Sequence, residues 1–295
     1  MSVHIGDIVG RKSYKCDLLF RVIEVKEKDD KKLVVLYGED VRLIADAPLE
    51  DLIVIDEREY KKRKKQLEEI ENHSFRLFRQ AYRLVRQKNE YTSTSGYKNE
   101  HAIFQMPGKV LHLDGDPLYL KKCKMLYERL HIPAYGFHMN EKEMPEKVER
   151  LIEQFRPDIL VITGHDAYSK TKGKVTELKA YRHSRYFVET VRRARGIEPN
   201  LDQLVIFAGA CQSHFESLIR AGANFASSPT RVNIHALDPV YVVAKISYTP
   251  FSEHVNVWEV LRNTLTGEKG LGGIQTRGIL RTGMPLMEHH DEEKP

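Results

Sequence analysis

The stretch that decides the fold class is residues 203–217, which read QLVIFAGACQSHFES. Its first part, residues 204–208, is apolar without alternation and includes two β-branched side chains. That pattern is typical of a strand that is covered on both faces in a parallel sheet. The small and polar residues behind it predict a sharp turn and then a helix. The stretch therefore predicts the strand, turn and helix of an α/β fold.

Cys211 stands in this turn, just before the helix predicted over 213–220, which opens with a Ser-x-x-Glu capping box. A thiol near a helix N-terminus has a lowered pKa, and backbone N–H groups there can stabilise an oxyanion. Gly209 and Ala210 are the candidates for this backbone role. Cys211 is therefore a candidate nucleophile, although small buried thiols are also common in tight turns.

Residues 158–165 read DILVITGH, a second apolar strand that ends in Gly164 and His165, with Asp166 next. Two neighbouring parallel strands would bring His165 and Cys211 to the same edge of the sheet. A Cys–His pair is the minimum for thiolate attack on an acyl carbon, because the imidazole accepts the thiol proton and later protonates the leaving amine. The alternative for His165 is a loop histidine that is bound to a backbone group.

From residue 109 onward the pattern alternates between strand and helix, which predicts a parallel sheet with helices on both faces and a site at the carboxyl ends of the strands. Strands are expected over 110–113, 134–138, 159–163, 204–208 and 241–248. Helices are expected over 118–130, 142–154, 182–195, 213–220 and 252–265. The polar residues at the predicted strand ends are Asp114, Asp116, His138, His165, Asp166 and Cys211.

The remaining segments differ in character from this α/β unit, which we place at 108–286. Five short strand-like runs (7–10, 18–25, 33–37, 41–45 and 51–55) predict a small SH3-like β-barrel over 1–56. Residues 57–91 have apolar positions at helical spacing and predict a helical connector, kinked near Asn72. Aperiodic residues 92–107 predict a linker, the glycine-rich run 267–283 a mobile loop, and residues 287–295 a disordered tail.

The composition is that of a soluble chain, with a net charge of +5 from 47 basic and 42 acidic residues. This mild excess does not demand nucleic acid, and we interpret the basic run 61–65 as the solvated face of a helix. The sequence has no apolar run of membrane-spanning length and no secretory core in residues 1–30, which predicts a cytoplasmic protein. Three widely spaced cysteines without a ligand set argue against disulfides, a metal or another cofactor.

The stretches TGHDAY and FAGACQSHFE resemble the caspase-like cysteine peptidases, in which a strand ending in His is followed by a strand ending in Ala-Cys. Caspases place the His about fifty residues before the Cys, and the interval from His165 to Cys211 is 46 residues. In caspase-like enzymes a Gly after the His supplies an oxyanion donor. Here Gly164 precedes the His, and it is the candidate that the resemblance carries over to this backbone role.

The chain up to Pro285 is similar to the YabG sporulation-specific proteases of spore-forming Firmicutes. This resemblance implies a caspase-like domain over 108–286 and a cysteine endopeptidase with Cys211 and His165 as catalytic residues. It further implies spore coat and cortex-associated proteins as substrates, and action in the mother cell, in its cytoplasm or associated with the coat.

The resemblance also implies that the pocket for the residue before the scissile bond lies beside the nucleophile, at the end of the first strand. Asp114 and Asp116 in LHLDGDP stand there, and Asp166 lies at the same edge. A carboxylate in a partly dry pocket selects Arg or Lys, so we predict cleavage after basic residues. Asp-Gly-Asp-Pro equally suits a turn and a helix cap.

Two other interpretations stay open at this point. GACQS is close to the nucleophile elbow of a class I amidotransferase-like hydrolase, whose His follows the Cys, and His235 in NIHALDP is the candidate. A non-enzymatic coat-assembly adaptor would instead use the barrel and the basic helix as binding surfaces. A nicotinamide-binding Rossmann domain fits least, because no G-x-G-x-x-G follows a strand. The oligomeric state is open.

Overall fold

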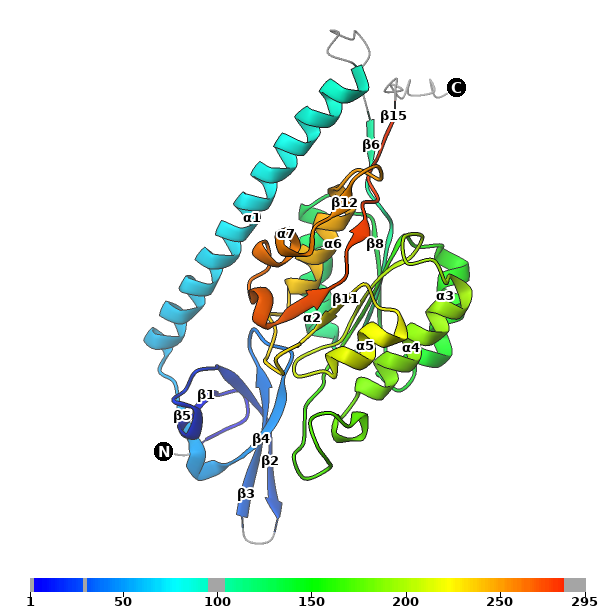
Figure 1. Ribbon diagram of the computed structural model, residues 1–295. Coiled ribbons are helices and arrows are strands. Elements are labelled where there is room, and N and C mark those ends of the chain that lie inside the picture. Colours follow the sequence, from blue (N-terminus) through cyan, green and yellow to red (C-terminus); the bar gives the residue numbers. More distant parts are fainter. Residues whose placement is uncertain (1–2, 29–30, 95–103, 284–295) are drawn as a thin grey trace, which may run out of the picture.

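The computed structural model describes residues 3–28, 31–94 and 104–283 (Figure 1). A small antiparallel sheet at the N-terminus is followed by one long helix and by an α/β unit with a six-stranded sheet. The long helix rises from the small sheet along the side of the α/β unit (Figure 1). This arrangement confirms the predicted α/β class with a separate N-terminal β structure.

The N-terminal sheet has the order β4-β3-β2-β1-β5, and all neighbouring strands are antiparallel. Its strands are β1 (Ile8–Arg11), β2 (Phe20–Lys28), β3 (Lys31–Gly38), β4 (Ile44–Pro48) and β5 (Leu52–Val54). Alternate side chains such as Val9, Val22 and Leu36 form its core. The strand predicted over 41–45 is wrong at its start, because Val41 makes an antiparallel bridge with His235 of the α/β unit instead of joining β4.

Helix α1 (Glu57–Thr94) contains 38 residues and is about 57 Å long. It is continuous through Asn72, where we predicted a kink. Its apolar stripe packs on the α/β unit through Phe78 and Tyr82, which both contact the ring of Tyr248. Most of the predicted linker lies outside the described residues, which resume at β6 (Phe104–Met106).

The large sheet has the order β13-β11-β10-β9-β7-β8. Its members are β7 (Val110–Asp114), β8 (Ala134–His138), β9 (Ile159–Thr163), β10 (Val205–Ala208), β11 (Phe225–Ser227) and β13 (Leu271–Gly273). The first five are parallel to their neighbours, and β13 is antiparallel to β11. Every residue of β7, β9 and β10 is buried, which explains why these runs are mainly apolar without alternation, whereas His112 and Asp114 of β7 have buried hydrogen-bond partners.

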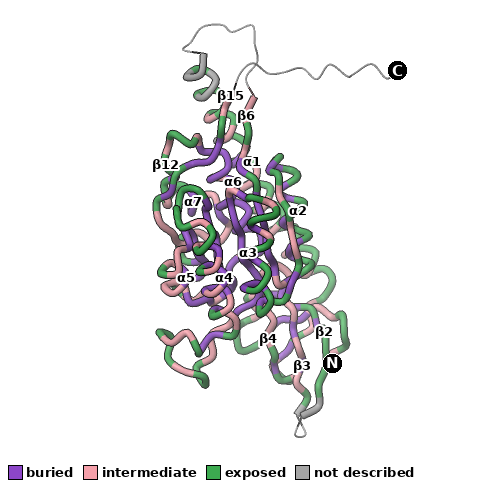
Figure 2. Tube along the Cα trace, turned by 90° about the vertical axis from the view of Figure 1, so that its right-hand side faces the viewer, coloured by how far each residue is buried: buried purple, intermediate pink, exposed green. Residues whose placement is uncertain are grey.

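Helices cover both faces of this sheet, and the buried residues lie between the layers (Figure 2). One face carries α2 (Pro117–Arg129), α6 (Asp238–Tyr248) and α7 (Val257–Arg262), with part of α1 outside them. The other face carries α3 (Met144–Phe155), α4 (Ser184–Ile197) and α5 (Phe215–Ala221). Within the described ranges, no helix has the length and apolarity needed to cross a bilayer.

Three predictions for the C-terminal part are wrong. Residues 241–248 form helix α6 rather than a strand, because a helix that is buried all round is as uniformly apolar as a buried strand. The helix predicted over 252–265 shrinks to α7, which Asn256 caps.

The glycine-rich run is ordered and contains β13, β14 (Thr276–Arg277) and β15 (Arg281–Gly283), paired with β11, β12 (His254–Val255) and β6. A Cβ on Gly273 would lie 2.4 Å from the Phe225 ring, so the glycine there serves close packing rather than mobility. The predicted tail over 287–295 lies outside the described residues.

Candidate active site

The loops that carry His165 and Cys211 follow the neighbouring strands β9 and β10, whose register pairs Ile162 with Ala208. Two hydrogen bonds join these loops. Ser213 Oγ donates to Asp166 Oδ2 over 3.0 Å, and the Tyr168 amide donates to Gln212 Oε1 over 3.2 Å. The residues that directly follow the two predicted catalytic positions are therefore hydrogen-bonded to each other at the carboxyl edge of the sheet.

The Cys211 side chain is fully buried. Its Sγ accepts a hydrogen bond from the Ile234 amide over 3.4 Å and lies 3.7 Å from the Ile234 carbonyl oxygen. Burial raises the pKa of the thiol to about 12, although the backbone amides of Ile234 and Arg42 act in the opposite direction. Deprotonation of this thiol therefore requires a base.

The predicted helix N-terminus at Ser213 is wrong, because α5 begins at Phe215 and is capped by His214, whose Nδ1 accepts from the Ser217 amide. Ser213 Oγ instead accepts from the Ala210 amide over 2.9 Å. The turn is longer than we predicted, since Gln212 takes a left-handed conformation with φ 56°. The helix therefore does not lower the pKa of Cys211.

The backbone at 209–211 is fixed by its own contacts. Gly209 has φ +110°, and a Cβ there would lie 2.4 Å from Ser227 Oγ. The Gly209 amide donates to Ile162 O over 2.9 Å, and the Ala210 amide is taken by Ser213. Among the described residues, the Cys211 amide has no hydrogen-bond acceptor, so it is the one of these three amides that is available to an oxyanion.

His165 is nearly buried between two carboxylates. Its Nε2 lies 3.0 Å from Asp116 Oδ2 and its Nδ1 lies 3.5 Å from Glu141 Oε1. Burial lowers the pKa of the imidazole, but the contacts with Asp116 and Glu141 outweigh burial and raise it above the ordinary value. No hydrogen bond joins the His165 ring to the Cys211 thiol within the part of the chain that the structure describes. The two groups are on adjacent loops without direct contact.

Glu141, which sequence reasoning missed, anchors the His165 loop. Its Oε1 accepts from the His165 amide over 2.8 Å and lies 3.6 Å from Nδ1 of His183. A Cβ on Gly164 would lie 2.6 Å from the same oxygen, so glycine is needed there for this close approach. Glu141 could have been found from its position three residues beyond β8. We instead predicted His138 as the polar residue at that strand end, and His138 is exposed.

Asp114 is fully buried and faces Arg42, a second residue that sequence reasoning missed. Arg42 Nη1 lies 2.6 Å from both carboxylate oxygens, and Nη2 lies 3.3 Å from Cys123 Sγ and from the Ala236 carbonyl oxygen. The guanidinium also lies 5.2 Å from the centre of the Tyr119 ring. We call the space formed by Asp114, Tyr119, Cys123 and the Ala236 carbonyl the arginine pocket. The signal was an arginine within the largely apolar run VRLIADA.

The other two predicted substrate carboxylates have partners within the fold. Asp116 caps α2 through the amides of Leu118 and Tyr119, and accepts from Tyr37 Oη over 2.8 Å. Asp166 accepts from the amides of Ala167 and His183 and from the hydroxyls of Ser184 and Ser213. Burial raises the pKa of Asp166 although these hydrogen bonds oppose the rise.

His235, the alternative catalytic histidine, faces helix α1. Its Nε2 lies 3.3 Å from Glu71 Oε1, and its Nδ1 accepts from the Leu237 amide over 3.2 Å. Both ring nitrogens therefore have partners other than Cys211. Across the described segments, no group of three or more His, Cys, Asp or Glu side chains is arranged to hold a metal ion.

Comparison with known proteins assigns nearly the whole chain to one family. The sequence model of the YabG peptidase U57 family matches residues 4–285. The chain belongs to this family. It is 62% identical over 286 residues to the sporulation-specific protease YabG of Bacillus subtilis (strain 168), covering 97% of this chain and 99% of that protein. The match spans the N-terminal sheet, α1 and the α/β unit together, so the family is defined by all three parts. The chain is therefore a peptidase.

Proposed function

We propose that this chain is a cysteine endopeptidase in which Cys211 is the nucleophile and His165 is the general base and acid. The observation that carries the proposal is the pair of loops after β9 and β10, which bring a thiol and an imidazole to one edge of the sheet. A thiol with a pKa of about 12 is almost entirely protonated near neutrality, so it needs the nearby imidazole to become a nucleophile.

In the proposed reaction, His165 takes the thiol proton while Sγ bonds to the scissile carbonyl carbon. The Cys211 amide stabilises the oxyanion that forms. His165 then protonates the leaving amine, and water hydrolyses the resulting thioester. Asp116 and Glu141 act through His165, because their negative charges make the imidazole more basic and stabilise the imidazolium.

We also propose that the enzyme cleaves after arginine. Asp114 lies at the base of the arginine pocket, and Tyr119 offers an aromatic face. These are the groups that recognise a guanidinium. A cleft of about 390 Å³ lies next to this site and is lined by Ile44 and Ala45 on one side and by Ala167, Tyr168 and Gln212 on the other. It gives an extended chain a path beside both catalytic loops.

The resemblance to YabG and the printed name of the relative support action during sporulation. We propose spore coat and cortex-associated proteins as substrates, processed in the mother cell either in its cytoplasm or at the coat. Membership of a peptidase family leaves the non-enzymatic adaptor without support. The amidotransferase-like arrangement is the competing mechanism, and it would need His235 in place of His165.

Purified variants and a fluorogenic peptide with arginine before the cleaved bond test this proposal. Cys211→Ala and His165→Gln should each abolish hydrolysis with an unchanged melting temperature, whereas Cys16→Ala, a control in the N-terminal sheet, should keep it. His235→Gln should retain activity, because that ring faces α1. Hydrolysis by a folded Cys211→Ala variant would overturn the proposal, and loss of activity in His235→Gln alone would favour the amidotransferase-like enzyme.

A further inference from the structure

Residues 40–42, between β3 and β4, leave the N-terminal sheet and pair with the α/β unit. Val41 makes an antiparallel bridge with His235, and the Ala236 amide donates to Asp40 O over 3.1 Å. We call these three residues the latch segment. The hydroxyl of Tyr119 fastens it further, because it donates to the carbonyl oxygens of Gly38 and Val41.

The last residue of the latch segment fills the arginine pocket. Arg42 is fully buried there, with Asp114 at its guanidinium and its backbone amide against the Cys211 thiol. Peptidase substrates commonly bind as an extended strand that pairs with the enzyme and places one side chain in a pocket beside the nucleophile. The latch segment has both features, and Arg42 stands in the position of the residue before the scissile bond.

The burial of Cys211 prevents substrates from reaching the thiol in this conformation. The thiol is 0% exposed, so a substrate carbonyl carbon cannot reach Sγ while the chain keeps this conformation. A substrate arginine also cannot enter a pocket in which Asp114, Cys123 and the Ala236 carbonyl are already bound by Arg42. Activity on another protein therefore requires the latch segment to move.

We propose that the latch segment is a built-in substrate mimic that holds the peptidase latent, and that substrate binding requires its withdrawal. This inference rests on the proposed function, since it takes the arginine pocket to be the substrate pocket. It adds that the N-terminal sheet regulates the site.

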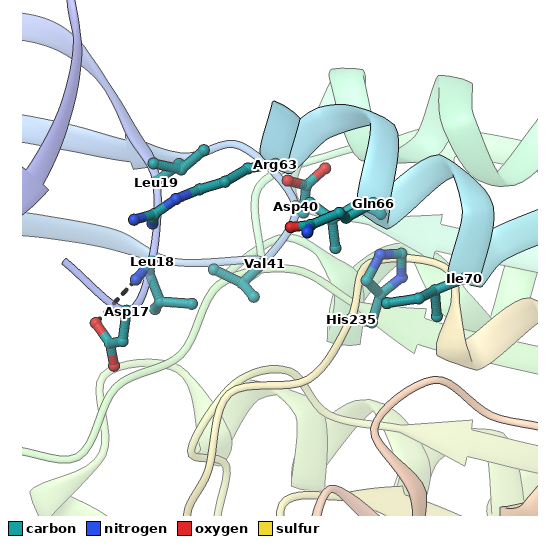
Figure 3. Close-up of a pocket in the computed structure, with 10 residues that line it drawn as sticks. Asp17, Leu18, Leu19, Asp40, Val41, Arg63, Gln66, Ile70 and His235 are labelled. Carbon is teal, nitrogen blue, oxygen red and sulfur yellow. Dashed lines mark hydrogen bonds between the residues drawn. The ribbon is translucent and has the colours of Figure 1, made fainter. Parts of the chain in front are cut away.

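The surroundings of the latch segment leave room for such a movement. A cavity of about 280 Å³ lies outside it, between the N-terminal sheet, α1 and the His235 loop. Figure 3 shows Asp40, Val41 and His235 around this space, with Gln66 and Ile70 of α1 across it. The side chain of Asp40 faces Lys122, whose Nζ lies 3.8 Å from its Oδ1. Withdrawal would expose the Arg42 side chain and remove Val41, which is only partly buried, from the edge of the α/β core.

The test measures how fast iodoacetamide alkylates Cys211, followed by peptide mapping, together with hydrolysis of the arginine peptide. Two full-length variants loosen the latch in different ways. Arg42→Ala removes the side chain from the pocket, and Tyr119→Phe removes the hydroxyl that holds the segment while keeping the ring that faces the pocket. Arg195→Ala is the control, because it removes a half-buried arginine with three hydrogen bonds that contacts neither the latch segment nor the site.

We expect the alkylation rate of Cys211 and kcat/KM to rise about tenfold or more in Arg42→Ala and by a smaller factor in Tyr119→Phe. The reason is that the site is open in only a minor fraction of wild-type molecules, and each variant increases that fraction. Intact mass checks that the bond after Arg42 is whole in every sample. Should Arg42→Ala fail to fold, Tyr119→Phe still decides the question.

Unchanged alkylation in both folded variants would overturn the latch, as would wild-type protein that is found cut after Arg42. Alkylation does not depend on hydrolysis, so these outcomes are separate from a failure of the proposed function. That failure would appear as hydrolysis without Cys211.

Discussion

Replacing Asp114 with asparagine tests the buried ion pair from which the specificity and the latch are both argued. The change leaves the shape of the side chain but removes the charge that faces Arg42, 2.6 Å away with both groups fully buried. At that distance two unit charges attract by about 6 kcal/mol at an effective dielectric constant of about 20. Because the pair also loses hydration on burial, breaking one side of such a pair costs about 3–5 kcal/mol of the free energy of unfolding.

For a domain of this size, we expect that loss to lower the melting temperature by about 6–20 °C. Urea unfolding followed by circular dichroism measures the free energy directly. Asp158→Asn is the matched control, because that carboxylate lies just before β9 and accepts one hydrogen bond from the Lys109 amide. It should cost about 1 kcal/mol.

The pH dependence of the free energy of unfolding is a second test of the Arg42–Asp114 pair. Arg42 holds the pKa of Asp114 well below its usual range, although burial alone would raise it. A carboxyl group with a depressed pKa stabilises the folded state above its unfolded pKa of about 3.9, and this stabilisation is lost as the pH falls further. The difference between wild type and Asp114→Asn should therefore be constant from about pH 5 to pH 8 and shrink below about pH 4.

The same variant should also lose its preference for arginine over leucine before the cleaved bond, measured with paired peptides. A loss of stability under about 1 kcal/mol would refute the argument that the pair is desolvated. If the variant loses the expected free energy of unfolding but keeps its preference for arginine, Asp114 has no role in substrate recognition and forms only a structural ion pair with Arg42.

The other predictions concern the two catalytic loops. Asp116→Asn should keep the cap of α2 but lower the pKa of His165. The fall of kcat/KM at acidic pH, where His165 becomes protonated and cannot act as a base, should then move to lower pH. If it does not move, the contact with Asp116 does not set the pKa of His165. Gly209→Ala should destabilise the fold by about 1–3 kcal/mol in thermal melts, because its φ is +110° and its Cβ would meet a serine hydroxyl at 2.4 Å. Ser213→Ala should reduce kcat more than it changes KM, because it frees the Ala210 amide and one bond of Asp166, and Ser213→Thr should restore the rate if the hydroxyl is what matters.

Four of the six strands of the large sheet, β7 to β10, were predictable from the sequence alone, whereas β11 and β13 were not predicted. Residues 205–208 are apolar at every position and residues 159–163 at every position but the last, and only a strand covered on both faces combines that pattern with so short a length. Their order along the chain then placed His165 and Cys211 at one edge. The same reasoning failed for 241–248, because a buried helix such as α6 has the same uniform apolarity, and only packing distinguishes the two.

Only the tertiary structure decided what surrounds the two candidate catalytic residues. The sequence indicates a thiol in a tight turn, but its raised pKa comes from burial beneath residues that are distant in the chain. Arg42 lies between β3 and β4, and Asp114 ends β7, 72 positions further along the chain, so neither residue type nor spacing could pair them. Burying the charge of Arg42 is costly without a carboxylate to offset it, and Asp114 rather than Asp40 or Asp46 supplies that carboxylate. That requirement acts through space, which is why the chemistry of the residues could be predicted but their partners could not.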